Sequence, residues 1–226
     1  MISLPKPKPL MTSSRSSDCR LVWITDDAEQ RIAEIARVSN PQNQQNRETA
    51  PRLLRYLIKH KHWSPFEMCN MCVEINTTRA ISAQIIRHRS FSYQEFSQRY
   101  MDVGALGSAE IPELRRQDRK NRQNSFNDFD HKDVGHFYRR IGELFEDTEH
   151  LYQEMVSSGV AKETARAILP MNTRTRIYMN GTIRSWIHYL QIRASEETQY
   201  EHRVIAESIL GIFADEMPDV YEAAFT

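Results

Sequence analysis

The stretch RHRSFSYQEFSQRY, from Arg87 to Tyr100, carries the densest set of polar chemistry in this 226-residue chain. It combines three arginines, one histidine, three serines and a single glutamate, Glu95. Guanidinium groups suit phosphates, and serine hydroxyls with backbone N–H groups complete anion-binding cages. Glu95 adds one acceptor for sugar hydroxyls, so the stretch favours a nucleotide ligand. Two other interpretations are a basic helix end stabilised by the helix dipole and a basic nucleic-acid patch.

The order of these residues resembles the signature of the flavin-dependent thymidylate synthases, R-H-R-x-x-S-x-N-E-x-S-x-R-Y. The chain departs at Gln94, where the family usually has Asn. Eight fixed positions at fixed spacing agree, which makes the match far more specific than a lone glycine-rich loop. These positions are Arg87, His88, Arg89, Ser92, Glu95, Ser97, Arg99 and Tyr100.

Four further blocks resemble the same family and extend the likeness over about residues 20–101 and 134–224. Thr182 is a departure, because many members have Asn two residues before the arginine that matches Arg184. The blocks are ARVS at 36–39, HWSPFE at 62–67, ETARAILP at 163–170 and RSWIHYLQIR at 184–193. On a helix, Arg184 and His188 share one side while Arg193 lies on the other.

The resemblance implies a thymidylate synthase that methylates dUMP reductively to dTMP. It implies 5,10-methylenetetrahydrofolate as the carbon donor, NADPH as the electron source and FAD as the hydride carrier. It also implies a compact subunit that assembles as a homotetramer with its sites at subunit contacts. Neither nucleic acid nor a membrane is an expected partner.

The resemblance also assigns roles to residues of this chain, and it implies no metal. Arg193 is expected to stabilise negative charge on the uracil ring, and His62 to act near the flavin and the folate. The residues expected to hold FAD are Ser39, Ser64, Arg87, His88, Arg89, Glu95, Arg184 and His188. Those expected to hold dUMP are Gln84, Arg87, Glu95, Ser97, Gln98, Arg99, Arg166 and Arg193.

Composition supports a small anionic ligand over a polyanion. Lys plus Arg equals Asp plus Glu at 30 each, whereas a general nucleic-acid binder is usually basic. The hydrophobic fraction of 40% is enough for a core, and one domain is expected over residues 19–226. Residues 1–18 are rich in Pro, Lys and Ser, which predicts a disordered tail and no signal peptide. A cytoplasmic protein is therefore expected.

The three cysteines indicate structural thiols. Cys69 and Cys72 form a C-x-x-C, but no second pair completes a zinc site. They fall in an apolar stretch that is expected to be a strand, where they point to opposite faces. Cys19 borders the tail. We expect that no cysteine performs the chemistry.

Periodicity predicts an α+β fold, an antiparallel sheet flanked by helices. One helix is expected from Thr78 to about Arg89, with Gln84, Arg87 and His88 on one face, and residues 102–133 are expected to be an exposed polar insertion. Strands are expected at 20–25, 67–76, 94–101 and 172–180. Further helices are expected at about 26–39, 49–61, 134–157, 161–169, 182–195, 198–214 and 217–224.

Two functions of other classes remain open from the residues alone. One is a nucleotide- or nucleic-acid-binding protein without catalysis, which uses the 87–99 cluster and the basic run at 115–122. The other is a flavoprotein of this fold that acts on another nucleotide.

Overall fold

The computed structural model describes residues 18–226, apart from the side chains at 131 and 133. The predicted disordered tail lies outside the described residues, except for Asp18, which opens a strand. Residues 18–75, with Ile86–Gln94 and Tyr178–Thr226, form one compact unit; Asn76–Ile85 and Glu95–Ile177 form another. The expected domain over residues 19–226 therefore contains two units, called here the first and the second unit.

A four-stranded sheet runs in the order β1 (Asp18–Ile24), β2 (Asn70–Thr78), β6 (Arg174–Thr182) and β3 (Phe91–Glu95). The strands are antiparallel. Arg20 of β1 binds Glu74 of β2, and the backbone N–H of Thr25 donates to the carbonyl of Asn70. The residue numbers on β2 therefore decrease as those on β1 increase, which is the pattern of antiparallel strands. Between β2 and β6, the Tyr178 hydroxyl donates to Glu74 and Arg176 donates to Asn76, so these two strands also run in opposite directions. The predicted fold class, a mixed fold with an antiparallel sheet and helices, is confirmed.

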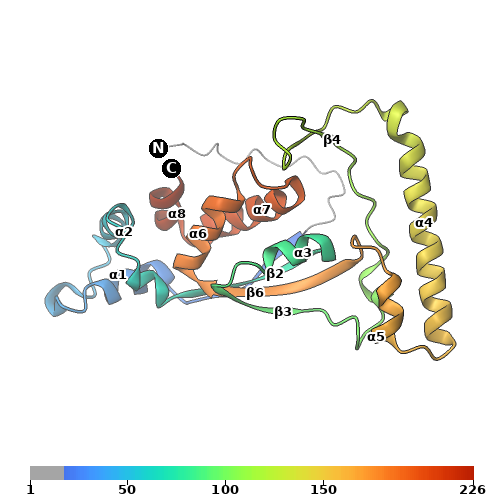
Figure 1. Ribbon diagram of the computed structural model, residues 1–226. Coiled ribbons are helices and arrows are strands. Elements are labelled where there is room, and N and C mark those ends of the chain that lie inside the picture. Colours follow the sequence, from blue (N-terminus) through green and yellow to red (C-terminus); the bar gives the residue numbers. More distant parts are fainter. Residues whose placement is uncertain (1–17) are drawn as a thin grey trace. The chain divides into compact units, whose positions relative to one another are not determined.

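The helices of the first unit are α1 (Ala28–Ala36), α2 (Ala50–Lys59), α6 (Ile183–Arg193), α7 (Tyr200–Glu216) and α8 (Pro218–Phe225). In this unit α7 packs against β1 and α6, and α8 packs against α2 and α7 (Figure 1). The core includes the fully buried rings of Trp186, Tyr189 and Phe213. In α6 and in α7 the buried apolar residues recur every three or four positions, so each helix has one apolar face that packs into the core.

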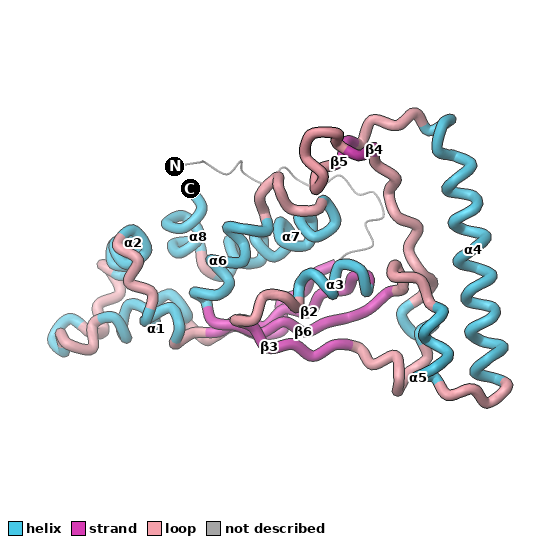
Figure 2. The backbone as a smooth tube through the Cα atoms, viewed as in Figure 1, coloured by secondary structure: helices cyan, strands magenta, loops and turns pink. Residues whose placement is uncertain are grey.

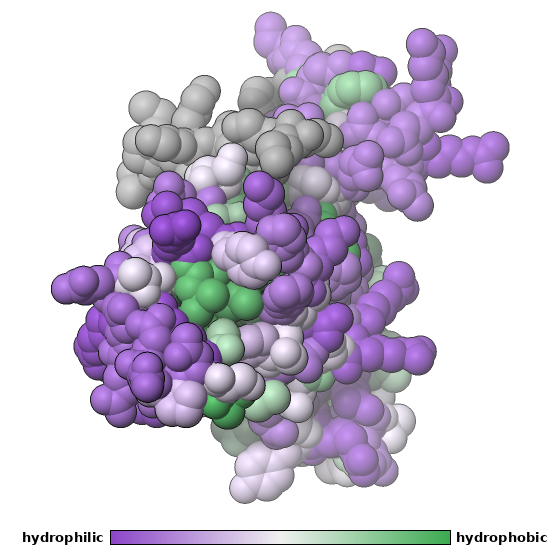
Figure 3. All heavy atoms as spheres, turned by 90° about the vertical axis from the view of Figure 1, so that its left-hand side faces the viewer, coloured by the Kyte–Doolittle hydropathy of each residue, from purple (hydrophilic) through white to green (hydrophobic). Residues whose placement is uncertain are grey.

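The α2 helix shows how the surface of the first unit arises. It buries Leu54 and Leu57 and leaves Arg52, Arg55 and Lys59 outside. Figure 3 looks at the side of α1 and α2, where most of the surface is hydrophilic and hydrophobic areas lie between the hydrophilic ones.

The second unit contains α3 (Arg79–Ile85), α4 (His131–Ser157), α5 (Lys162–Ala165) and a short hairpin of β4 (Arg116–Gln117) and β5 (Ser125–Phe126) (Figure 2). Short 3-10 turns lie at Val103–Leu106 and Arg166–Ile168. A small core cluster joins Val103, Tyr152 and Ala165. None of the described helices is both long enough and apolar enough to cross a membrane.

Two predicted elements next to the R-H-R segment are wrong. The helix ends at Ile85 instead of about Arg89, so Gln84, Arg87 and His88 do not share a helix face. The strand covers Phe91–Glu95 instead of 94–101. Tertiary contacts explain both shifts, because the turn at 86–90 lets the His88 ring pack edge-on against the Tyr189 ring, 4.9 Å between centroids.

The polar insertion at about 102–133 has more structure than its composition predicts. Val103 is buried in the core cluster, and α4 already begins at residue 131. The Asp118 carboxylate accepts from the backbone N–H groups of Lys120 and Asn121, which closes the turn between β4 and β5. The side chains of most residues from 115 to 129 are exposed, as expected.

Candidate cofactor and substrate sites

The first unit contains a cavity of about 390 Å³ beside α6. Its lining combines a planar indole, a guanidinium, an imidazole and short polar side chains. These are the groups that recognise a planar, anionic ligand. The lining residues are Trp63, Glu67, Ser90, Arg184, Ser185, Ile187, His188 and Gln191.

The α6 helix positions the charged groups of this cavity. The Thr182 side chain accepts from the Ser185 N–H and caps the helix, so the residue that departs from the usual Asn has a structural role. Arg184 and His188 stand one turn apart on the cavity side, and the Arg184 guanidinium is ion-paired with Glu67. Arg193, at the end of the helix, points elsewhere, as the spacing predicts.

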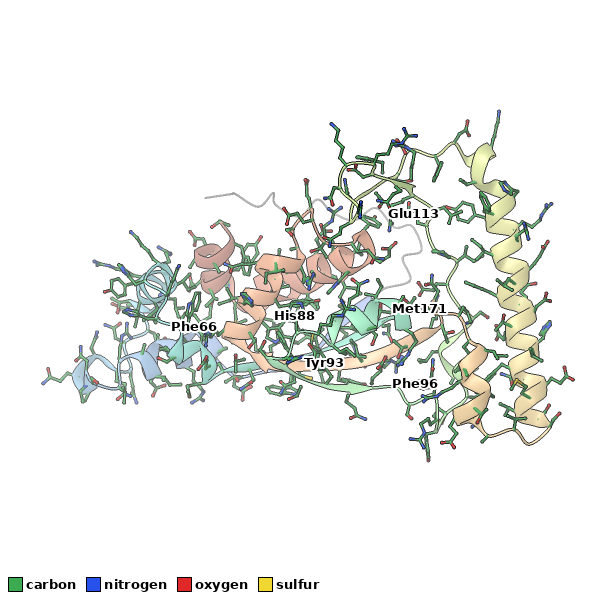
Figure 4. All side chains as sticks on the ribbon, viewed as in Figure 1. Phe66, His88, Tyr93, Phe96, Glu113 and Met171 are labelled. Atoms are coloured by element: carbon green, nitrogen blue, oxygen red, sulfur yellow. The ribbon has the colours of Figure 1, made fainter. Side chains whose placement is uncertain are left out.

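Arg193 contacts the R-H-R segment. Its Nε–H donates to His88 Nε2 at 2.8 Å, and the Tyr93 hydroxyl donates to the His88 backbone carbonyl at 2.8 Å (Figure 4). Burial, together with the charges of Arg193 and His188, lowers the pKa of His88 to about 4. Because Arg has no acceptor, Nε2 of His88 must be unprotonated, so the imidazole is neutral and carries its proton on Nδ1.

A second buried pair lies beneath His88. The Tyr189 hydroxyl and His202 Nε2 are 3.0 Å apart, and both side chains are fully buried. Burial, followed by the charges of Arg193 and His88, lowers the pKa of His202 to about 3. Sequence reasoning missed this pair because both residues sit on core faces; the signal was a histidine on the apolar face of α7.

The other predicted flavin and folate residues of the first unit do not line the cavity. Ser39, Ser64, Arg87 and Arg89 are exposed. In the HWSPFE block, Trp63 and Glu67 line the cavity in place of Ser64. The sequence analysis gave neither residue a role.

His62 is exposed at the end of α2, as expected. Its ring lies 5.9 Å from the Tyr56 ring and 6.1 Å from the His60 ring, measured between centroids. The three rings form an exposed aromatic group in the first unit.

In the second unit, Glu95 is the centre of a polar cluster. Its Oε1 atom lies 2.8 Å from an Arg79 guanidinium nitrogen and accepts from the hydroxyls of Ser82 at 2.7 Å and Thr175 at 2.9 Å. Ser82 and Thr175 are almost fully buried. None of these three partners was singled out from the sequence, because they come from α3 and β6 and meet Glu95 only in the fold.

The remaining predicted dUMP residues also belong to the second unit. Arg99 forms an exposed ion pair with Glu163 at 2.8 Å, which brings it to the segment that contains Arg166. Gln98 is buried, and its Nε2 atom meets no hydrogen-bond partner within residues 18–226. Ser97 is exposed and Gln84 is half-buried.

The cysteines have the properties of structural thiols. Cys19, Cys69 and Cys72 are free, and burial raises the pKa of all three, that of Cys19 to about 12. Cys69 lies just before β2, and Cys72 lies within it. Both side chains are buried, because β2 is covered on both of its faces. Among the described residues, no group of three His, Cys, Asp or Glu could hold a metal ion.

Comparison with known proteins identifies the family of this chain. The family model described as "Thymidylate synthase complementing protein" matches residues 20–219. The chain belongs to this family. A probable flavin-dependent thymidylate synthase of Paramecium bursaria Chlorella virus 1 is 47% identical over 196 residues, 87% of this chain and 90% of the relative. A flavin-dependent thymidylate synthase of Synechocystis sp. is 50% identical over 192 residues, 85% of this chain and 87% of the relative.

A solved structure shares the fold. A UMP/dUMP methylase from Streptomyces cacaoi, bound with 5-Br dUMP, superposes with a TM-score of 0.81 at 26% identity and covers 92% of this chain and 93% of its own. The chain is thus a member of the flavin-dependent thymidylate synthase family, and the family inferred from the R-H-R signature is confirmed.

Proposed function

We propose that this enzyme converts dUMP to dTMP by reductive methylation, with 5,10-methylenetetrahydrofolate as carbon donor, NADPH as electron source and FAD as hydride carrier. The names of its relatives support FAD and thymidylate synthesis, and the solved relative bound with a uridylate analogue supports a uracil nucleotide as substrate. What supports the reaction most directly is α6, which presents Arg184 and His188 to a cavity and Arg193 to His88.

The residues of the first unit fit FAD by their chemistry. Trp63 offers a planar face, and Arg184 a guanidinium for an anionic group. A volume of about 390 Å³ is at the small end of ligand cavities, which span roughly 300–1,000 Å³, so it suits one part of a dinucleotide. FAD, when bound, supplies the hydride-transfer chemistry. In this unit we assign its binding to Ser39, Ser64, Arg87, His88, Arg89, Arg184 and His188; Glu95, the eighth residue that the resemblance implies, belongs to the second unit.

We assign the dUMP phosphate to Arg99 and Arg166. The Arg99–Glu163 pair is exposed on both sides, so it contributes little stability and a phosphate can replace Glu163 as the partner of Arg99. The buried Gln98 amide, with an unpaired donor, is a further polar group for the nucleotide. The full set is Gln84, Arg87, Glu95, Ser97, Gln98, Arg99, Arg166 and Arg193.

Arg193 is the residue to which we assign charge stabilisation on the uracil ring. Its Nε–H is held by His88, and its terminal nitrogens carry further donors for a ligand oxygen. A neutral His88 orients the guanidinium without cancelling its charge, which keeps the full positive charge for a developing oxyanion. His62 is assigned to the flavin and folate side of the reaction.

Assembly as a homotetramer with sites at subunit contacts follows from the same proposal. The cavity beside α6 supports it, because this cavity has room for only part of FAD. Three free thiols support a cytoplasmic enzyme, since a reducing compartment keeps cysteines unpaired. Equal numbers of acidic and basic residues speak against a nucleic-acid partner.

One assay tests the proposal. Purified protein with FAD and methylenetetrahydrofolate should oxidise NADPH and form dTMP only when dUMP is added. Because the solved relative is a UMP/dUMP methylase, UMP is the matched second substrate. If the protein turns over UMP and not dUMP, the assigned substrate is wrong. If the protein is colourless and takes up no FAD, it is not a flavoenzyme.

A further inference from the structure

The long α4 helix of the second unit carries an exposed apolar stripe. Phe137, Leu144 and Leu151 are 49%, 61% and 48% exposed. They follow one another at intervals of seven residues, and seven residues return an α-helix to within about 20° of its starting direction. The three side chains therefore stand in a row along the helix. The side of α4 next to this row carries the buried residues Val134 and Tyr152, so the row borders the packed face of the helix.

Charged residues of opposite sign occupy the gaps in this row. Arg140 lies between Phe137 and Leu144, and Asp147 lies between Leu144 and Leu151. Both are exposed. The second half of the helix is acidic, whereas the first half carries all of its basic residues together with Asp133 and Glu143. The basic residues are Lys132, Arg139 and Arg140; the acidic ones after Leu144 are Glu146, Asp147, Glu149 and Glu154.

We propose that this stripe pairs with the same stripe of a second copy of the chain, antiparallel and centred on Leu144. In that register Leu144 meets Leu144 of the second copy, and Phe137 meets its Leu151. Arg140 then comes beside Asp147 of the second copy, and the two-fold symmetry makes this ion pair twice.

Charge decides both the partner and the direction. A parallel pair sets Arg140 beside Arg140 and Asp147 beside Asp147, and like charges in close contact are unfavourable. The antiparallel pair sets Arg139 and Arg140 of each helix against the acidic second half of the other. A surface that complements itself in this way fits a second copy of this chain. The inference concerns α4 alone, so it stands whether or not the proposed reaction is correct.

Mass measurement by light scattering on the full-length protein tests the contact. Leu144→Glu sets two carboxylates against each other at the centre and should reduce the wild-type mass by half without changing the circular dichroism spectrum. The matched control is Glu146→Lys, which changes an exposed charge on the far side of the same helix and should keep the mass.

Charge reversal tests the register. Arg140→Asp and Asp147→Arg should each raise the dissociation constant roughly tenfold or more, because each creates like-charge contacts. The double variant should return it close to the wild-type value. A double variant as weak as the singles overturns the proposal, and so does a wild-type chain that stays monomeric.

Cross-linking tests the direction. An antiparallel pair brings only the central residue next to its own copy, so Leu144→Cys should form a covalent dimer on oxidation while Phe137→Cys should not. Phe137→Cys cross-linked to itself contradicts the antiparallel arrangement. Self-association could be unchanged in every α4 variant and be lost when residues 1–17 are removed. That result would assign the contact to residues 1–17 and overturn the inference.

Discussion

Two arginines, one in each unit, make 2.8 Å contacts with very different partners. In the first unit Arg193 donates to a neutral imidazole, His88; in the second unit Arg79 meets the carboxylate Glu95. A neutral acceptor orients the guanidinium and leaves its charge available to a ligand. A carboxylate cancels that charge and adds stability to the fold. We therefore propose Arg193 as a binding group and Arg79 as a group that stabilises the fold, although the two contact distances are the same.

The largest stability effect is expected at Glu95. Glu95→Ala takes the acceptor from the buried hydroxyls of Ser82 and Thr175 and leaves Arg79 without its ion pair. We expect a loss of about 3 kcal/mol in the free energy of unfolding, because unpaired buried donors are costly. Urea unfolding measures it. The control, Glu163→Ala, breaks the exposed Arg99 pair and should cost about 1 kcal/mol or less.

Paired arginine variants test which residues bind which ligand. Arg184→Ala should weaken FAD binding and keep dUMP affinity, and Arg99→Ala should do the reverse. Each loss should be about 1.5–3 kcal/mol, the contribution of a charge-assisted hydrogen bond. Flavin fluorescence titration and calorimetry with dUMP measure the two affinities. If Arg99→Ala releases flavin and retains dUMP, the assignment of ligands is wrong.

Two histidines of the first unit, the half-buried His88 and the buried His202, should make stability depend on pH. Their pKa values are about 4 for His88 and about 3 for His202, against an ordinary value of 6.5. Below pH 6.5 the unfolded chain binds protons that the folded chain does not, so this stabilisation is complete above pH 6.5 and is lost as pH falls toward these folded-state values.

For the fully buried His202 the loss is at most about 1.4 kcal/mol per pH unit. Urea unfolding at several values from pH 7 to pH 4.5 should show a steeper fall for the wild type than for His202→Gln. The exposed His150→Gln is the control and should keep the wild-type slope. Equal slopes in all three proteins contradict a neutral, buried His202.

The smallest effect is expected for the cysteines. A nucleophilic thiol needs a lowered pKa, and burial raises the pKa of Cys19, Cys69 and Cys72. A variant with alanine at all three positions, once shown to fold, should keep most of its dUMP-dependent NADPH oxidation. Complete loss of dTMP formation with FAD and dUMP still bound would assign the chemistry to a thiol.

Local pattern predicted those parts of the fold that depend on neighbours along the chain. The periodicity of Ile183, Trp186 and Leu190 placed α6 within two residues at each end, and the i, i+4 spacing put Arg184 and His188 on one side of it. The same rule was wrong at Arg87 and His88. There a long-range contact with α6 stops the helix at Ile85.

The sequence by itself determined the family, the main elements and the residue types of the candidate sites. Motif spacing and side-chain periodicity are properties of the linear chain, so both can be recognised without knowledge of the fold. Only the tertiary structure decided which arginine meets which partner. Arg193 and His88 are 105 residues apart, and Thr175 and Glu95 are 80 apart. Such contacts form when the strands and helices pack, and that packing also sets the burial that keeps His88 neutral.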